Sequence, residues 1–482
     1  MLILALEAST TSAKTMLFDT ETQEVTVRTR RFVIGGEDPA VREAEGIFVQ
    51  LVQLGAEAAA GRAVDMIALS GTWHGMTLRE PDLAPITAVQ EWPYTGAQDL
   101  CAQLREDQEF TRWFYVRTGC MVNASYPAFK LMLLRRQGMQ VAGGLVLDQN
   151  SYTFARLTGR VWTSYSQASG TGLLSTAEDD WDREVISRLG LDGILLPELH
   201  HGEETAPLTR EAASMLGVAA GTPVVLPGPD GGLNQVGEDA TTPGEMTFSM
   251  GTSGALRCAV EAPSLSPQMS TWAYRSPTGW LSGAATSGCT NCVDWAKDQL
   301  FGGSTTYNQL EPMLSTRERD MPLFMPFLFG ERCPGWQDQR RGGFLDLHPS
   351  HGKEDLYQSV LHGVTFSLYH CYRELIALNG EPERIILSGG VLSSPFWTQL
   401  TADVFGVEME LSALQHSSTV GAVKMALRAA GLPAAQPALT DSHRASVVPE
   451  LTRSRRYAAE FERYLEGYAR TSPDQDVRGG LR

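Results

Sequence analysis

Residues 223–257 have the sequence PVVLPGPDGGLNQVGEDATTPGEMTFSMGTSGALR and combine a strand, a turn, a helix and a second hairpin. The apolar residues 224–226 predict a buried strand, and residues 231–235 can begin a helix. Asp230 therefore lies where a strand ends and a helix starts, the position at which open α/β folds bind their ligands. An isolated aspartate here would be interpreted as a helix N-cap.

Residues 246–260 predict a β-hairpin whose turn is Gly251-Thr252-Ser253-Gly254, and a similar unit opens the chain. There, apolar residues 2–6 lead into a Ser/Thr-rich turn at 9–12, and residues 16–18 are apolar again. Such a turn can direct several backbone N–H groups and hydroxyls at an anion. Either turn alone would be an ordinary tight turn. Together they predict two related halves that hold one polyphosphate between them.

Short apolar runs alternate with helix-like patterns along the chain, which favours an α/β fold. Helices are expected at 127–136, 355–378, 395–405 and 417–430, and a strand at 384–388. We expect Ser417 or Ser418 to cap the helix at 417–430. Residues 471–482 are polar and are expected to form a frayed tail.

Composition limits the classes of function. At 482 residues the chain is longer than the roughly 250–300 residues of one hydrophobic core, so two domains are expected. A net charge of −17 argues against nucleic acid as a partner. The seven cysteines are scattered, and the N-terminus has no basic leader, so we expect a cytoplasmic protein. The longest apolar run is only residues 321–329, so no membrane segment is expected.

The order and spacing of several motifs resemble the FGGY family of carbohydrate kinases over nearly the whole chain. The motifs are Thr10-Thr-Ser-Ala-Lys14, Ser70-Gly-Thr-Trp-His-Gly75, Ser125-Tyr-Pro-Ala-Phe-Lys-Leu131, Tyr165-Ser-Gln-Ala-Ser-Gly-Thr-Gly172, the Asp230 segment, Gly251-Thr-Ser-Gly254, Gly330-Glu-Arg-Cys-Pro334 and Leu387-Ser-Gly-Gly390. The resemblance implies two actin-like, ribonuclease-H-like α/β domains with a catalytic cleft between them. We expect a sugar-binding domain at 1–242, carrying the first phosphate loop and the catalytic base, and a nucleotide-binding domain at 243–482.

The resemblance also implies roles for individual residues. Asp230 would be the general base that accepts the proton of the acceptor hydroxyl, since kinase chemistry needs little more than alignment and charge neutralisation. Glu7 and Asp230 would lie beside Mg²⁺. The ATP-binding residues would be Thr10, Thr11, Ser12, Lys14, Gly251, Thr252, Gly288, Gly389, Gly390 and Ser394. The sugar-binding residues would be Trp73, His74, Trp92, Ser125 and Asp230, although His74 could equally be a structural histidine.

Two segments depart from the family pattern at the expected site. The first loop has Glu7-Ala-Ser9 where the family usually has Asp-x-Gly, and Glu91-Trp-Pro-Tyr-Thr-Gly96 lacks the family's sugar-facing Asp and Arg. Two lesser departures are Asp346-Leu347 and His362. The pair Cys289 and Cys292 has no second pair or histidine cluster, so a zinc site is not expected.

The favoured interpretation is an ATP- and Mg²⁺-dependent kinase for a sugar, sugar acid or polyol, with gluconate as the first candidate. The alternatives are a xylulokinase-like pentulose kinase and a catalytically silent regulator that binds sugar or nucleotide. An actin-like or Hsp70-like ATPase is a weaker alternative, because those proteins lack the context of His74 and Gly330-Glu-Arg332. Family members are often dimers, so a homodimer is an expectation, with no interface marked in the sequence.

Overall fold

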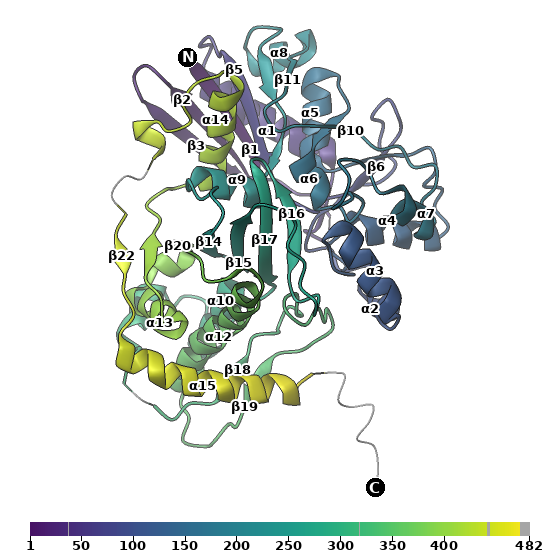
Figure 1. Cartoon of the computed structure of the whole chain (residues 1–482). Coiled ribbons are helices and arrows are strands. Elements are labelled where there is room, and N and C mark those ends of the chain that lie inside the picture. The colour runs from purple at the N-terminus through teal and green to yellow at the C-terminus, as the bar shows by residue number, and fades with distance from the viewer. Residues whose placement is uncertain (37, 318, 441–443, 473–482) are drawn as a thin grey trace.

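The computed structural model describes residues 1–36, 38–317, 319–440 and 444–472, and Figure 1 shows them as two halves, each built around a mixed β-sheet. The predicted α/β class is confirmed. Every strand of the first sheet precedes residue 230, and every strand of the second follows residue 244. The domain boundary at 242/243 stays a prediction.

The first sheet begins with the predicted N-terminal hairpin, β1 (Leu2–Ala8) and β2 (Ser12–Asp19). Because side chains alternate across a strand, Leu4 and Leu6 join one hydrophobic cluster and Ile3 and Ala5 join another. The sheet order is β11 (Thr205–Pro207), β12 (Pro223–Val225), β5 (Met66–Gly71), β1, β2 and β3 (Val25–Arg31), with β13 (Gly228–Pro229) on β5. Helices α1 (Ala44–Ala59), α5 (Gln149–Thr158) and α8 (Arg210–Leu216) contribute to the Leu4 cluster.

The second sheet repeats this topology. Its hairpin of β14 (Glu245–Met250) and β15 (Gly254–Val260) corresponds to β1 and β2, and β14 pairs in parallel with β20 (Arg384–Gly389) as β1 does with β5. The full order is β16 (Trp272–Ser276), β17 (Gly279–Thr286), β15, β14, β20, β21 (Met409–Leu411) and β22 (Ser446–Val447). The prediction of two related halves is thereby confirmed.

Helices cover the second sheet, and the two that begin at Lys353 and Pro395 lie close to the ranges expected from the sequence. The helices are α10 (Thr290–Phe301), α12 (Lys353–Asn379), α13 (Pro395–Phe405) and α15 (Leu451–Arg470). Smaller elements here are α11 (Tyr307–Leu310), β18 (Leu323–Met325), β19 (Gly343–Leu345) and the 3₁₀ turns η1 (Glu311–Met313), η2 (Gly390–Ser393) and η3 (Pro437–Leu439). Most of the expected tail, residues 473–482, lies outside the described residues.

A mainly helical insertion extends the first half between β5 and β11 (Figure 1). Its helices are α2 (Gln98–Arg105), α3 (Gln108–Thr118), α4 (Pro127–Arg136), α6 (Tyr165–Ser169) and α7 (Arg183–Arg188). Its short strands are β6 (Thr77–Arg79), β7 (Val89–Gln90), β8 (Leu145–Leu147), β9 (Trp162–Ser164) and β10 (Glu198–His200), and β4 (Val41–Arg42) pairs with β7.

Two helices cross at the junction between the halves, α9 (Asp230–Gly237) and α14 (Ser417–Ala429). A Cβ added to Gly237 would lie 2.0 Å from the carbonyl oxygen of Ser417, and one added to Gly421 would lie 2.0 Å from that of Leu233. The helices therefore approach backbone to backbone, at a distance that only glycine permits. Although α14 lies between β21 and β22 of the second sheet in sequence, it packs on β1 and β5 of the first.

The expectation that Ser417 or Ser418 caps α14 is wrong. The N-cap is His416, which has a left-handed backbone (φ 64°) and makes no side-chain cap hydrogen bond. The hydroxyl of Ser417 contacts Asn234 of α9 instead, at 2.9 Å, and that of Ser418 donates to Glu7 of β1. Both hydroxyls therefore form hydrogen bonds across the junction and do not cap the helix.

Candidate active site

The Glu7 carboxylate, at the end of β1, is buried and accepts hydrogen bonds from both halves. Its Oε1 accepts from Lys14 Nζ at 2.7 Å, and its Oε2 from Ser70 Oγ at 3.2 Å, Thr419 Oγ1 at 2.8 Å and Ser418 Oγ. Burial alone would raise the pKa of Glu7, but Lys14 and these hydroxyls outweigh it and hold the pKa below its usual range. The charge that replaces the expected Asp-x-Gly aspartate is therefore kept, and it is fully engaged by protein donors.

The first loop closes on itself through Ser9. The hydroxyl of Ser9 accepts from the backbone N–H of Ser12 at 3.2 Å and lies 3.0 Å from the Ser12 hydroxyl, so the Ser12 side chain is buried within the turn. Thr11 is exposed at the tip, and the Thr10 hydroxyl accepts from Trp92 Nε1 at 3.2 Å. Thr10 and Thr11 therefore have side chains at the outside of the turn, and Lys14, whose side chain is 23% exposed, pairs with Glu7.

Asp230 is the first residue of α9. The N-cap of this helix is Pro229, so Asp230 is not the N-cap. Its Oδ1 accepts from the backbone N–H of Gly231 at 2.7 Å. Burial raises the pKa of Asp230 to about 6, the negative charge of Glu7 acts in the same direction, and the Arg257 guanidinium opposes both. A carboxylate with this pKa can accept a proton near neutral pH.

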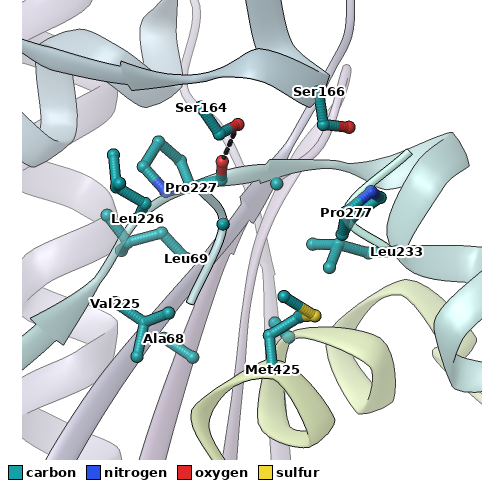
Figure 2. Close-up of a pocket in the computed structure, with 13 residues that line it drawn as sticks. Ala68, Leu69, Ser164, Ser166, Val225, Leu226, Pro227, Leu233, Pro277 and Met425 are labelled. Carbon is teal, nitrogen blue, oxygen red and sulfur yellow. Dashed lines mark hydrogen bonds between the residues drawn. The ribbon is translucent and has the colours of Figure 1, made fainter. Parts of the chain in front are cut away.

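The turn that carries Asp230 is held from behind. Ser164 Oγ donates to the carbonyl of Pro227 at 2.7 Å, as Figure 2 shows. In the same view Leu233, Pro277 and Met425 converge on a small pocket behind the turn, and none of the residues that line it is ionisable. Pro277 and Met425 belong to the second half of the chain, so both halves fix the position of Asp230.

The second loop is joined to the start of α10. The carbonyl of Gly251 accepts from the Thr290 N–H at 2.9 Å, and the Thr252 side chain is exposed. Gly288 lies just before this helix, where an added Cβ would be 2.4 Å from the Pro326 carbonyl oxygen. Gly288 therefore permits close chain packing beside the loop, whereas Thr252 is available to a ligand.

Gly389 and Gly390 form an exposed strip beside the same loop. Gly389 pairs with Met250 in the parallel register and has φ +99°, and an added Cβ would lie 2.4 Å from the Met250 carbonyl oxygen. A Cβ added to Gly390, which is exposed, would make ordinary contact with Thr290 Cγ2 at 3.5 Å. Ser394 follows, but its hydroxyl caps α13 and donates to Glu311 at 2.7 Å. The backbone of Gly389 and Gly390 is therefore exposed, whereas the Ser394 hydroxyl is engaged within the second half.

Trp73 and His74 lie within an aromatic cluster at the end of β5. Trp73 Nε1 donates to the Ser166 carbonyl at 2.9 Å, and His74 Nδ1 lies 2.7 Å from the Gly170 carbonyl. Burial, and then the positive charge of Arg332, lowers the pKa of His74 to about 3, so the ring is neutral at physiological pH. Tyr274 contacts both rings edge-on. The cluster forms an aromatic wall beside the first turn of α9, where a Cβ added to Gly231 would lie 3.0 Å from Trp73 Cζ3.

The remaining predicted sugar residues are tied into the first half. The Ser125 hydroxyl donates to Asn123 Oδ1 at 2.7 Å, and Trp92 is held through Thr10. Glu91, in the segment that departs from the family pattern, forms a buried ion pair with Arg42. Each of these side chains is therefore held by a partner within the first half.

Four side chains at the site had no role assigned to them from the sequence: Arg257, which acts on Asp230, Arg332, which acts on His74, and Ser418 and Thr419, which bond to Glu7. Arg257 interrupts an otherwise apolar strand, which is a detectable signal. No local sequence signal marked Ser418 and Thr419, because their partner Glu7 lies more than 400 residues away in the chain.

The residues of the site suit a nucleotide better than a metal ion bound by protein side chains alone. The exposed loop and glycine strip suit a nucleotide. For Mg²⁺, both Glu7 oxygens already accept protein donors, whereas one Asp230 carboxylate oxygen has no donor among the residues that the structure describes. Among the described residues, no group of three or more His, Cys, Asp or Glu side chains could hold a metal, and this includes Cys289 and Cys292. The donors suit a Mg²⁺ ion carried largely by phosphates.

Two repeated α/β halves that each carry a hairpin loop, with the buried carboxylates of Glu7 and Asp230 near the junction between them, favour the actin-like class of two-domain phosphotransferases. The chain matches the N-terminal domain of the FGGY family of carbohydrate kinases over residues 2–237 and the C-terminal domain over residues 246–430. It belongs to this family and is therefore an ATP-dependent sugar phosphotransferase.

Relatives with two different acceptors resemble the chain. A gluconokinase from Bacillus subtilis is 25% identical over 89% of this chain and 88% of its own length. A xylulose kinase from Escherichia coli is 27% identical over 83% and 82%. The crystal structure of a gluconate kinase from Lactobacillus acidophilus superposes with a TM-score of 0.88 at 24% identity, over 97% of each chain. Within the described residues, no helix is long and apolar enough to cross a membrane.

Proposed function

We propose that this protein transfers the γ-phosphoryl group of MgATP to a hydroxyl of a sugar acid, with gluconate as the first candidate. The observation that carries the proposal is the position of Asp230. It is a buried carboxylate with its pKa raised to about 6, and Trp73 of the aromatic wall lies against Gly231, the residue that follows it.

Asp230 would act as the general base. Its carboxylate would align the acceptor hydroxyl and take up its proton as the oxygen attacks the γ-phosphorus. Mg²⁺ bound with ATP would neutralise charge on the phosphates. It would lie beside Asp230 and Glu7 and be held mainly by phosphate oxygens. A direct bond from Glu7 would require the loss of one of its hydroxyl donors.

The other predicted nucleotide residues would act through backbone and hydroxyl groups. Thr10 and Thr11 from the first loop and Thr252 from the second would meet the phosphates, while Gly389 and Gly390 would lie along the adenine. Closure of the halves about α9 and α14 would exclude water from the phosphoryl group. The seven cysteines are all free and buried, and we propose the cytoplasm as the site of the reaction.

Gluconate and xylulose remain the competing acceptors, because relatives of both names match the chain. The positively charged Arg257 and Arg332 beside His74 favour an anionic acceptor over a neutral pentulose. The retained carboxylate and exposed second loop favour an active kinase over a silent regulator.

Coupled measurement of ADP release tests the function. The purified protein is supplied with MgATP and, in turn, gluconate, xylulose, ribulose or glycerol, with Asp230→Asn as the inactive control. We expect gluconate to give the highest kcat/KM. If no acceptor raised ADP release above the Asp230→Asn background, the silent regulator would be the better interpretation.

A further inference from the structure

Arg257, on β15, lies directly against the residue that follows Asp230. A Cβ added to Gly231 would lie 2.9 Å from Arg257 Nε and 3.0 Å from Trp73 Cζ3. The guanidinium therefore covers the first turn of α9, beside the aromatic wall. Backbone N–H groups give a helix N-terminus a partial positive charge, so a cation at this place is electrostatically unfavourable without a neighbouring anion.

The structure provides little compensation for this charge. Among the described residues, the Arg257 guanidinium donates one hydrogen bond, from Nη1 to Ser249 Oγ at 3.2 Å, and no carboxylate lies within ion-pair distance. Its Nε is buried without a partner. Asp230 is near enough to raise the pKa of Arg257, but burial has the larger effect and the net pKa is lowered.

A second arginine adds to the positive charge. In the part of the chain that the structure describes, the Arg332 side chain has no hydrogen bond or ion pair, and its Nε is also buried without a partner. Arg332 and Arg257 repel one another, and both act on the His74 ring. Two partly buried guanidinium groups with unpaired Nε atoms are costly unless an anion joins them.

The position of Arg257 favours an acceptor group over the ATP phosphates. Arg257 follows Gly254 by three residues, which places it about 10 Å along the strand from the second loop. Its neighbour Trp73 stacks on His74, with ring centroids 6.0 Å apart. Arg257 therefore faces the aromatic wall, on the side of Asp230 where the proposed function places the acceptor.

We propose that Arg257, with Arg332, binds the carboxylate of the sugar-acid acceptor and selects it over neutral polyols and ketoses. This inference rests on the proposed function and names the residues that decide its substrate class. The planar guanidinium can donate two parallel hydrogen bonds to a carboxylate, which fixes orientation as well as charge. With its carboxylate held there, the remaining chain of the sugar acid extends past His74 and brings a hydroxyl to Asp230.

Gluconate and sorbitol form a matched ligand pair, because sorbitol has the same six-carbon chain with CH₂OH in place of the carboxylate. Binding is measured by calorimetry without nucleotide, and kcat/KM by ADP release. We expect the unaltered protein to prefer gluconate by at least about 100-fold, in line with the loss of a desolvated charge pair. Equal affinity for the two ligands, or no gluconate binding, would overturn the inference without any variant.

Arg257→Gln should weaken gluconate binding by about 100-fold and leave sorbitol within about threefold. Arg257→Lys, which keeps the charge but loses the planar fork, should recover part of the gluconate affinity. Arg275→Gln is the matched control, since Arg275 lies on β16 of the same sheet and pairs with Asp179 at the surface. It should leave both ligands unaffected.

Three outcomes are distinguishable. Equal weakening of gluconate and sorbitol by Arg257→Gln would assign Arg257 to packing, and a selective loss of ATP affinity would assign it to the phosphates. Either result overturns the inference. Gluconate binding that depends on Arg257, in a protein that phosphorylates no acceptor, would uphold the carboxylate site while the proposed kinase function failed.

Discussion

Thr419 Oγ1 donates a hydrogen bond to Glu7 Oε2 at 2.8 Å, across 412 residues of sequence. Thr419 lies in the first turn of α14, where the partial positive charge of the helix favours a carboxylate. Lys14 holds the other carboxylate oxygen at 2.7 Å. Glu7 therefore connects the first loop to α14, the helix that crosses the junction. A movement of α14 would shift the Glu7 carboxylate at the base of that loop.

Glu7→Gln should destabilise the protein, because it leaves Lys14 without its partner and weakens the bonds from Ser418 and Thr419. Lys14 is partly exposed and can be rehydrated, so we expect a loss of about 1–3 kcal/mol. Thermal unfolding should show a Tm lower by several degrees. Glu57→Gln, which removes an exposed ion pair with Arg30, is the control and should change the Tm little.

The same Glu7→Gln protein also tests a role beside the metal. Because the Glu7 oxygens are engaged by protein donors, we expect the Mg²⁺ concentration for half-maximal activity to change less than twofold. A clearly raised Mg²⁺ requirement at an unchanged Tm would instead assign Glu7 to the metal.

Asp230→Asn should lower kcat by about 10²–10⁴-fold, because the acceptor hydroxyl loses its proton acceptor. ATP affinity, measured by calorimetry, should stay within about twofold, since the predicted nucleotide contacts come from the two loops and the Gly389 strip. Asp179→Asn, an exposed change at the Arg275 ion pair, provides the control. Unchanged turnover in Asp230→Asn would exclude Asp230 as the base.

The pH dependence should report the Asp230 carboxyl directly. A base must be deprotonated, so kcat/KM should fall as the pH drops through about 6, by about tenfold per unit once the carboxyl is protonated. A profile that stayed flat down to pH 5 would contradict a raised pKa for Asp230.

Stability should change with pH in the opposite sense. The pKa of Asp230 is raised from 3.8 to about 6 on folding, so the folded state binds this proton more tightly. The stabilisation is present at acid pH and is lost as the pH rises through 6. At pH 7, Asp230→Asn should therefore raise the free energy of unfolding by about 1 kcal/mol or more. A lower Tm in Asp230→Asn at pH 7 would contradict this.

Gly421→Ala should separate the crossing helices, because its new Cβ would lie 2.0 Å from the Leu233 carbonyl oxygen, which is backbone and cannot rotate away. We expect a loss of more than about 2 kcal/mol in thermal or urea unfolding. Gly46→Ala, in α1 with no atom nearer than 3.8 Å to the added Cβ, should be neutral or slightly stabilising. Equal effects of the two changes would show that the close helix crossing carries no special constraint.

Local patterns were enough to predict much of the fold. The two hairpins, the helix at 395–405 and the position of Asp230 between a strand and a helix all follow from periodicity and turn residues within a few positions of each other. Local capping rules failed only where a distant partner competed. Ser417 and Ser418 bond to Asn234 and Glu7, and α14 begins without a side-chain cap.

The sequence by itself determined the α/β class, the repeated loops, the family and the candidate base, because each depends on neighbouring residues or on motif order. Only the tertiary structure decided that Glu7 is anchored by Ser418 and Thr419, that α14 returns to the first sheet, and that Arg257 and Arg332 carry unpaired charge beside His74. These features depend on which residues meet across the junction between the halves. The close backbone contact of α9 with α14 is one such meeting, and no local propensity encodes it.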